Sequence, residues 1–151
     1  RGLNFVKQEQ LDLEERSFRE ALHCDVSFAS AHNNLGLVLL ERGRYYEAAT
    51  EFSFASRLAP RAIEPRMSLG RLYEAIGWYN EAVAEYRKAV EFDGNDPEAV
   101  GRLASASLRA GKSPADIDAL LRKLTDHKDS EWSRWAHSQL KIQGVVQPAT
   151  E

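Results

Sequence analysis

The sequence of 151 residues repeats itself with a period of 34 residues. When it is shifted against itself by that period, glycines, leucines and aromatic residues fall in shared columns. The clearest columns are Gly43, Gly77 and Gly111; Leu35, Leu69 and Leu103; and Phe18, Phe52 and Tyr86, which Leu120 continues. A period of this length is typical of solenoid proteins, in which one supersecondary unit is copied and each copy packs against its neighbours.

The composition predicts that the repeated unit is helical. The chain has 20 alanines and 17 leucines against 12 valines and isoleucines, so good helix formers outnumber β-branched residues. Hydrophobic residues make up 43% of the chain, which suffices for a core, and the net charge of −3 argues against nucleic-acid binding through a basic face. No apolar stretch approaches the roughly 18 residues that a membrane span needs. We therefore expect a folded, soluble, all-α protein.

Two glycine columns predict how the helices end and pack. The column of Gly43 follows amphipathic stretches, and a left-handed glycine there ends a helix without strain. Gly36 and Gly70 lie in mid-helix instead, where glycine costs about 1 kcal/mol relative to alanine. Close packing against Ala48 and Ala82 of the partner helix is expected to offset this cost. The aromatic column is expected to fill the seam between one helix pair and the next.

These patterns predict a series of helices joined in antiparallel pairs. The expected helices span residues 2–8, 11–24, 29–42, 45–58, 63–76, 79–92, 97–110, 114–126 and 130–142. The last helix carries Trp132, Trp135, Ala136 and Leu140 on one stripe, which indicates a helix that covers the end of the solenoid.

The repeat resembles the tetratricopeptide repeat, whose signature is W-x2-L-G-x2-Y…A-x3-F…P. Two units match this signature: His32-x2-Leu35-Gly36-x2-Leu39 with Ala48-x3-Phe52 and Pro60, and Arg66-x2-Leu69-Gly70-x2-Tyr73 with Ala82-x3-Tyr86. The tryptophan of the family is replaced by His32, Arg66 and Val100. The resemblance implies a right-handed superhelix of about three to four antiparallel helix pairs plus a C-terminal capping helix.

The period then divides the chain into units. We expect a partial first unit at 1–28, units at 29–62 and 63–96, a degenerate unit at 97–128, a capping helix at 129–143 and a flexible tail at 144–151. Because the first unit is partial, we also expect a longer parent chain.

The sequence offers no arrangement typical of an enzyme or a cofactor site. The four histidines do not form a metal-binding pair on one helix face, and no phosphate-binding loop or nucleophile motif occurs. The turn from Asp93 to Asp96 lacks the terminal glutamate of a calcium loop. Cys24 shares its column with Leu58 and Phe92, which predicts a buried thiol that acts as a small hydrophobic residue. We therefore predict no catalytic residue, no metal and no cofactor.

The family resemblance implies a protein-interaction scaffold with a concave groove lined by the first helix of each pair. The residues predicted to line this groove are Asn33, Asn34, Leu37, Leu40, Glu41, Met67, Arg71, Glu74, Arg102 and Arg109. The N-terminal half is apolar and the C-terminal half gathers arginines, so we expect a partner segment with an apolar stretch and an acidic part. Packing between adjacent first helices is the alternative role of the leucines, and a solvated face beside glutamates is that of the arginines.

Other uses of such a solenoid are weighed against the residues present. A clamp for the C-terminal carboxylate of a chaperone is not supported, because Glu64 and Ser68 stand where the clamp needs lysine and arginine. Asn34 matches one rung of the asparagine ladder of O-linked glycosyltransferases, so a substrate-docking or regulatory segment of a larger enzyme is the alternative. A self-assembling structural solenoid, with homo-oligomer contacts through Tyr46 and Trp78 or through the C-terminal cap, is a further one.

Overall fold

The computed structural model describes residues 2–128 and 130–144, with side chains from residue 4 onward. This part of the chain contains eight α-helices and no strand. The helices are α1 (Gly2–Cys24), α2 (Ala29–Glu41), α3 (Tyr45–Leu58), α4 (Glu64–Ala75), α5 (Tyr79–Phe92), α6 (Pro97–Arg109), α7 (Pro114–Thr125) and α8 (Glu131–Ile142). The predicted all-α fold is confirmed.

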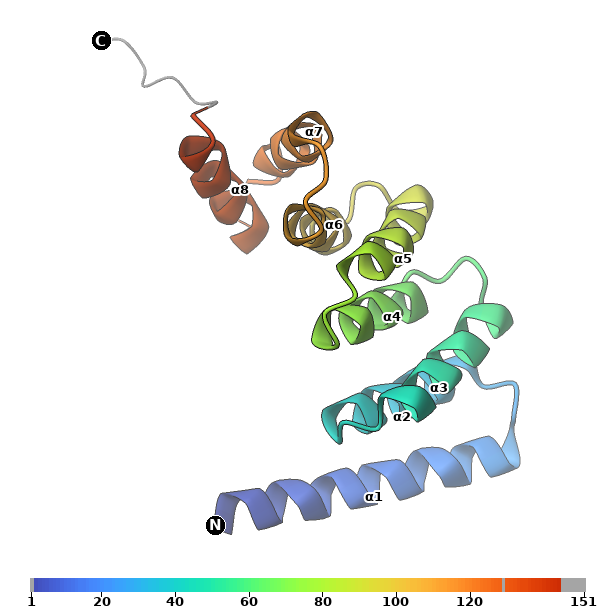
Figure 1. Cartoon of the computed structure of the whole chain (residues 1–151). Helices are drawn as coiled ribbons and strands as arrows, with labels where there is room; N and C mark the ends of the chain where they lie inside the picture. Colours follow the sequence, from blue (N-terminus) through green and yellow to red (C-terminus); the bar gives the residue numbers. More distant parts are fainter. Residues whose placement is uncertain (1, 129, 145–151) are drawn as a thin grey trace.

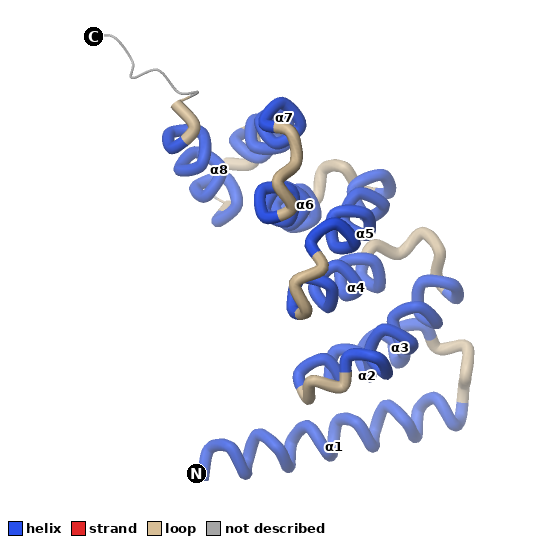
Figure 2. Tube along the Cα trace, in the orientation of Figure 1, coloured by secondary structure: helices blue, strands red, loops and turns tan. Residues whose placement is uncertain are grey.

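The helices stack as antiparallel pairs into a curved rod (Figure 1). The pairs are α2 with α3, α4 with α5, and α6 with α7, while α1 packs on α2 at one end and α8 packs on α6 and α7 at the other. In the pairs α4–α5 and α6–α7 the first helix lies on the inner side of the curve and the second on the outer side, as the trace in Figure 2 also shows. This arrangement is the predicted solenoid of stacked helix pairs.

The glycine column ends the first helix of each pair as predicted. Gly43, Gly77 and Gly111 follow α2, α4 and α6 and have φ values of 72°, 79° and 64°. A side chain in this left-handed conformation brings Cβ against the backbone, so glycine is the favoured residue at each turn.

The mid-helix glycines make room for aromatic rings. A Cβ added to Gly36 would lie 2.5 Å from Cε1 of Phe52, and one added to Gly70 would lie 2.3 Å from Cε1 of Tyr86. Both rings are fully buried. Phe52, one turn further along α3 than Ala48, supplies the nearest atoms to the space that the missing Cβ of Gly36 leaves. Ala48 is buried in the same core cluster, so its predicted packing against Gly36 stays a prediction.

The column of His32, Arg66 and Val100 joins the two helices of each pair. Nδ1 of His32 lies 2.6 Å from Oε2 of Glu51, and Nη1 of Arg66 lies 3.0 Å from Oε2 of Glu85, one period later. In the third pair the position holds Val100, which is fully buried in an apolar cluster. The same position thus supplies a cross-helix polar contact in two pairs and an apolar contact in the third.

The N-terminal region differs from the prediction. Residues 2–8 and 11–24 do not form two helices, because α1 runs without a break from Gly2 to Cys24. Neither glycine nor proline interrupts the chain between Leu3 and Cys24, and hydrogen bonds from Gln8 to Asp12 and from Gln10 to Glu14 support the helix at the expected break. The other expected helices match the structure within one residue at each end.

Cys24 also departs from the prediction, because it is exposed. Its column partners Leu58 and Phe92 are 42% and 48% exposed. Each of the three is the last residue of its helix. The division of the chain into repeat units stays a prediction. Of the tail predicted at 144–151, residues 145–151 lie outside the described residues.

Candidate functional site

A cavity of about 440 Å³ is lined by residues of α2, α4 and α6. It is lined by Leu40, Arg71, Glu74, Ala75, Arg102, Ser105 and Arg109. Five of the ten residues predicted to line the groove therefore share one cavity, although they come from three different helices. We call this cavity the arginine pocket.

Glu74 is held in place within the arginine pocket. The hydroxyl of Tyr86 donates a hydrogen bond of 2.8 Å to Oε2 of Glu74, and Nη1 of Arg102 lies 3.5 Å from the same oxygen. Burial and the hydrogen bond to Glu74 together raise the pKa of Tyr86 far above its ordinary value, so the hydroxyl remains a donor. The guanidinium of Arg102 also lies 5.8 Å from the centroid of the Trp132 ring.

The two other arginines of the pocket, Arg109 and Arg71, differ in their contacts with neighbouring side chains. Nη1 of Arg109 donates a hydrogen bond of 3.3 Å to the Tyr79 hydroxyl, and its guanidinium lies 5.5 Å from the centroid of that ring. Arg71 is exposed and forms no ion pair with any residue between 4 and 128 or between 130 and 144. With three arginines and one glutamate, the pocket is cationic, and Arg71 is the charge most available to a ligand.

A second cavity of about 390 Å³ lies near the N-terminal ends of α2 and α4. It is lined by Ala29, Ser30, Asn33, Asn34, Ala59, Ala62, Glu64 and Pro65. Oδ1 of Asn33 is buried and receives no hydrogen bond from the described part of the chain. An acceptor left in this state costs free energy, so a donor from a ligand would be favourable there.

The remaining predicted groove residues have different surroundings. Leu37 and Leu40 are half-buried and pack against the core of Leu35 and Leu39, so neighbour packing accounts for part of their surface. Met67 departs from the prediction: only 9% of it is exposed, and it packs in a core cluster with residues of α5. Glu41 is exposed, and its Oε2 lies 3.6 Å from Nζ of Lys7 in α1. It lines neither of the two cavities.

Comparison with known proteins identifies the family. The family model described as the tetratricopeptide repeat matches residues 1–63 and 33–97, which together make up more than half of the chain. The chain belongs to the tetratricopeptide repeat family.

Relatives and solved structures agree with this assignment. A human relative, Superkiller complex protein 3, is 29% identical over 127 residues, which are 84% of this chain and 8% of that protein. A tetratricopeptide repeat protein from Parabacteroides merdae superposes with a TM-score of 0.78 at 18% identity, over 95% of this chain and 57% of that one. An O-GlcNAc transferase from Thermobaculum terrenum gives a TM-score of 0.67 at 25% identity, over 74% of this chain and 22% of that one. This chain thus spans a small part of the length of its human relative.

Two features of this tetratricopeptide repeat solenoid escape prediction from the sequence. One is the Tyr86 hydroxyl, which reaches Glu74 from the core although Tyr86 itself was expected only to fill a seam. The other is Gly101, on which the ring of Trp132 from α8 lies so closely that an added Cβ would be 2.1 Å from its Cδ2. Gly101 shares a column with Asn33 and Met67, so the signal was a glycine where the other units carry side chains.

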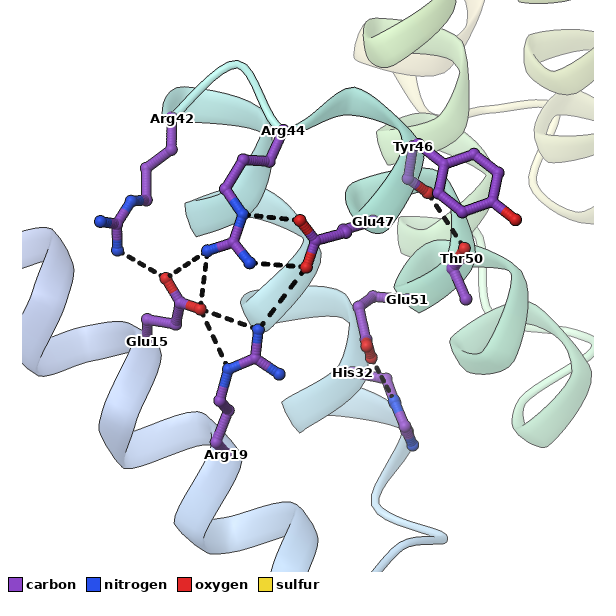
Figure 3. Close-up of polar contacts among 9 residues, drawn as sticks. All are labelled: Glu15, Arg19, His32, Arg42, Arg44, Tyr46, Glu47, Thr50 and Glu51. Atoms are coloured by element: carbon purple, nitrogen blue, oxygen red, sulfur yellow. Dashed lines mark hydrogen bonds and ion pairs between the residues drawn. The ribbon is translucent and has the colours of Figure 1, made fainter.

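A charged cluster ties α1 to the first complete pair (Figure 3). The carboxylate of Glu15 is buried and accepts hydrogen bonds from Arg19 of α1, from Arg42 and from Arg44 at the turn between α2 and α3. Burial alone raises the pKa of Glu15, but hydrogen bonds from Arg19 and Arg44 outweigh it and hold the pKa below its ordinary value. Because Arg44 also pairs with Glu47 of α3, the cluster connects three helices.

The described residues set limits on other kinds of site. Within residues 2–128 and 130–144, no helix has both the length and the apolar character needed to cross a membrane. The same residues contain no group of three or more side chains suited to hold a metal ion. Tyr46 is 87% exposed, and Trp78 is 56% exposed and stacks on Tyr73 with ring centroids 6.2 Å apart.

Proposed function

We propose that this chain is an interaction scaffold whose groove binds a partner segment carrying an apolar stretch and an acidic part. Tetratricopeptide repeats indicate a protein–protein interaction scaffold, and the family match covers most of the helices that line the groove. The observation that carries the finer proposal is the arginine pocket, in which Leu40 lies beside Arg71, Arg102 and Arg109. Such a pocket accepts a carboxylate from the partner while the leucine contacts an apolar side chain.

The spacing of the two cavities suggests how a segment would lie. Asn33 and Leu40 are separated by seven residues of α2, which is about 10 Å along the helix axis. An extended segment covers this distance in about three residues. A backbone N–H group at Asn33, an apolar side chain near Leu37 and an acidic group near Arg71 would then follow one another within one short motif.

Selection of peptides from a displayed random library tests this proposal. The immobilised wild-type chain should enrich peptides in which an apolar residue lies within about three residues of aspartate or glutamate. Arg71→Glu should lose this preference and bind the wild-type peptides at least tenfold more weakly, because a charge-assisted pair becomes a repulsion. Arg87→Glu, which reverses an exposed charge on the outer helix α5, is the matched control and should behave as wild type. Selected peptides without acidic residues, or equal binding by Arg71→Glu, would contradict the proposal.

A second candidate function is a substrate-docking or regulatory segment of a larger enzyme. The similarity to a stretch of an O-GlcNAc transferase supports this alternative. The asparagine ladder that the resemblance implies is not established, because Ser68 and Arg102 occupy the places equivalent to Asn34. The sequence of the parent chain distinguishes the two, since an attached catalytic domain would favour docking and further repeats alone would favour a scaffold. We propose no catalytic role for the chain itself.

A further inference from the structure

We infer that Tyr86, a core residue that does not line the arginine pocket, controls the charge of that pocket by positioning Glu74. The inference rests on the proposed function, because the pocket is the part of the groove that would receive the partner's acidic group. Tyr86 acts here as a positioning residue: its hydroxyl holds Glu74, and Glu74 in turn lies against Arg102.

The path of the Tyr86 side chain is visible in the packing. Its ring is fully buried and lies against Gly70, where a Cβ would be within 2.3 Å of ring atom Cε1. Glu74 follows Gly70 by about one turn of α4, and the Tyr86 hydroxyl donates to its carboxylate at 2.8 Å. Tyr86 thus brings a hydrogen-bond donor from the outer helix to Glu74, whereas phenylalanine or leucine in this column has no side-chain donor.

The repeat itself supports a specific role for the hydroxyl. The column of Tyr86 holds Phe52 in the preceding unit and Leu120 in the following one. The column of Glu74 holds Leu40 and Leu108 at the same places. The hydroxyl therefore occurs in the unit that has the carboxylate, and the two neighbouring units have neither. Since Phe52 fits against Gly36 as Tyr86 fits against Gly70, the core does not need the hydroxyl for packing.

The held carboxylate has a direct consequence for the pocket. Glu74 accepts from Tyr86 and lies 3.5 Å from Arg102, so it is kept on one side of the pocket while Arg71 stays free of ion pairs within the described residues. Without the hydroxyl, the carboxylate loses its neutral donor and is drawn toward the arginines. It would then neutralise charge that a ligand needs, and the ligand's acidic group would have to displace it.

The first test needs no ligand. In wild type and in Tyr86→Phe, the side-chain Nε–H signal of Arg102 and the carboxyl carbon signal of Glu74 are recorded by NMR, together with thermal unfolding. We expect both signals to move in Tyr86→Phe, whereas the Nε–H signal of Arg134, an exposed arginine of α8, stays in place. Because Phe52 occupies the equivalent site, the variant should remain folded. Unchanged signals of Arg102 and Glu74 in the folded variant would overturn the inference.

The second test uses sulfate as an anionic probe at constant ionic strength, followed through the side-chain signals of Arg71 and Arg102. Relative to wild type, Tyr86→Phe should bind sulfate about threefold more weakly, and Glu74→Gln should bind it several-fold more tightly because one negative charge is removed. In the Glu74→Gln background, adding Tyr86→Phe should change nothing. A general effect of Tyr86→Phe on packing would instead weaken binding equally in both backgrounds and would overturn the inference.

The two experiments separate failure of the inference from failure of the proposed function. If Tyr86→Phe shifts the Glu74 and Arg102 signals but peptide selection shows no acidic preference, the positioning is correct and the proposed partner is wrong. If acidic peptides are selected and Tyr86→Phe has no effect on Arg102 or on sulfate, the partner class is correct and Tyr86 has no positioning role.

Discussion

Gly70 and Tyr86 pack against each other, and the next unit has Ala104 and Leu120 at these positions. Replacing the first pair by the second tests whether the glycine is needed to make room for the ring. Gly70→Ala adds a Cβ that would lie 2.3–2.7 Å from three atoms of the buried Tyr86 ring. Alanine gains about 1 kcal/mol of helix propensity over glycine. Overpacking of a rigid, buried contact costs about 1–3 kcal/mol, and a separation this short places the cost at the upper end. We therefore expect Gly70→Ala to lower the free energy of unfolding by about 1–2 kcal/mol.

The neighbouring unit supplies the compensating change. There, Ala104 and Leu120 stand at the positions of Gly70 and Tyr86; Ala104 is buried in an apolar cluster, and the partly buried Leu120 packs against that cluster. Tyr86→Leu alone leaves a cavity and should cost about 2–4 kcal/mol. In the double variant the new Cβ occupies part of that cavity, so the combined loss should be about 1–2 kcal/mol smaller than the sum of the single losses. Urea unfolding followed by circular dichroism measures all four free energies, and strict additivity would refute this account of the glycine column.

Three further perturbations follow from the described contacts. Gln in place of Glu15 should destabilise the chain by about 1–3 kcal/mol at pH 7, because three arginines lose their shared acceptor. Since the folded-state pKa of Glu15 lies below its ordinary value of 4.5, its contribution is present above that pH and disappears as the pH falls, so wild type and variant should converge in acid denaturation scans. Gly101→Ala should displace the Trp132 ring, which is measured as a change in tryptophan fluorescence with a stability loss of about 1–3 kcal/mol. Gly43→Ala meets no atom within 4 Å, so a loss of about 1 kcal/mol in urea unfolding should reflect the φ of 72° alone, and a larger loss would show that the turn makes contacts not accounted for.

The period of the sequence suffices to predict most of the fold because each unit packs mainly against its neighbours. The columns of glycine, leucine and aromatic residues record these local contacts, and the helices from α2 to α8 follow them closely. The prediction from the period is wrong at the N-terminus. Residues 11–24 lie one period before α3, but no glycine precedes them as Gly43 precedes α3, so residues 2–10 and 11–24 form one continuous helix. Burial of Cys24 was inferred from its apolar column partners Leu58 and Phe92, and this inference is wrong because all three residues of the column are exposed.

The candidate site is harder to predict, because long polar side chains reach beyond their own column. A column predicts which helix face a residue occupies. This was enough to predict that Arg71, Glu74 and Arg102 lie in one groove, and all three line the same cavity. A column does not predict that Arg109 turns to the Tyr79 ring. These contacts depend on neighbours from another helix, whose register becomes known only when the pairs are stacked.

Comparing two columns at once would have recovered part of this information. Glu74 and Tyr86 each place a polar group in a column that is apolar in the neighbouring units. These two polar groups lie in the same unit and form a hydrogen bond of 2.8 Å. A polar group added to an otherwise apolar core column must find a partner, because an unpaired buried hydroxyl costs free energy. The nearest polar departure on the facing helix is then the expected partner. In a repeat protein, paired departures of this kind therefore indicate where one unit has acquired chemistry that its neighbours lack.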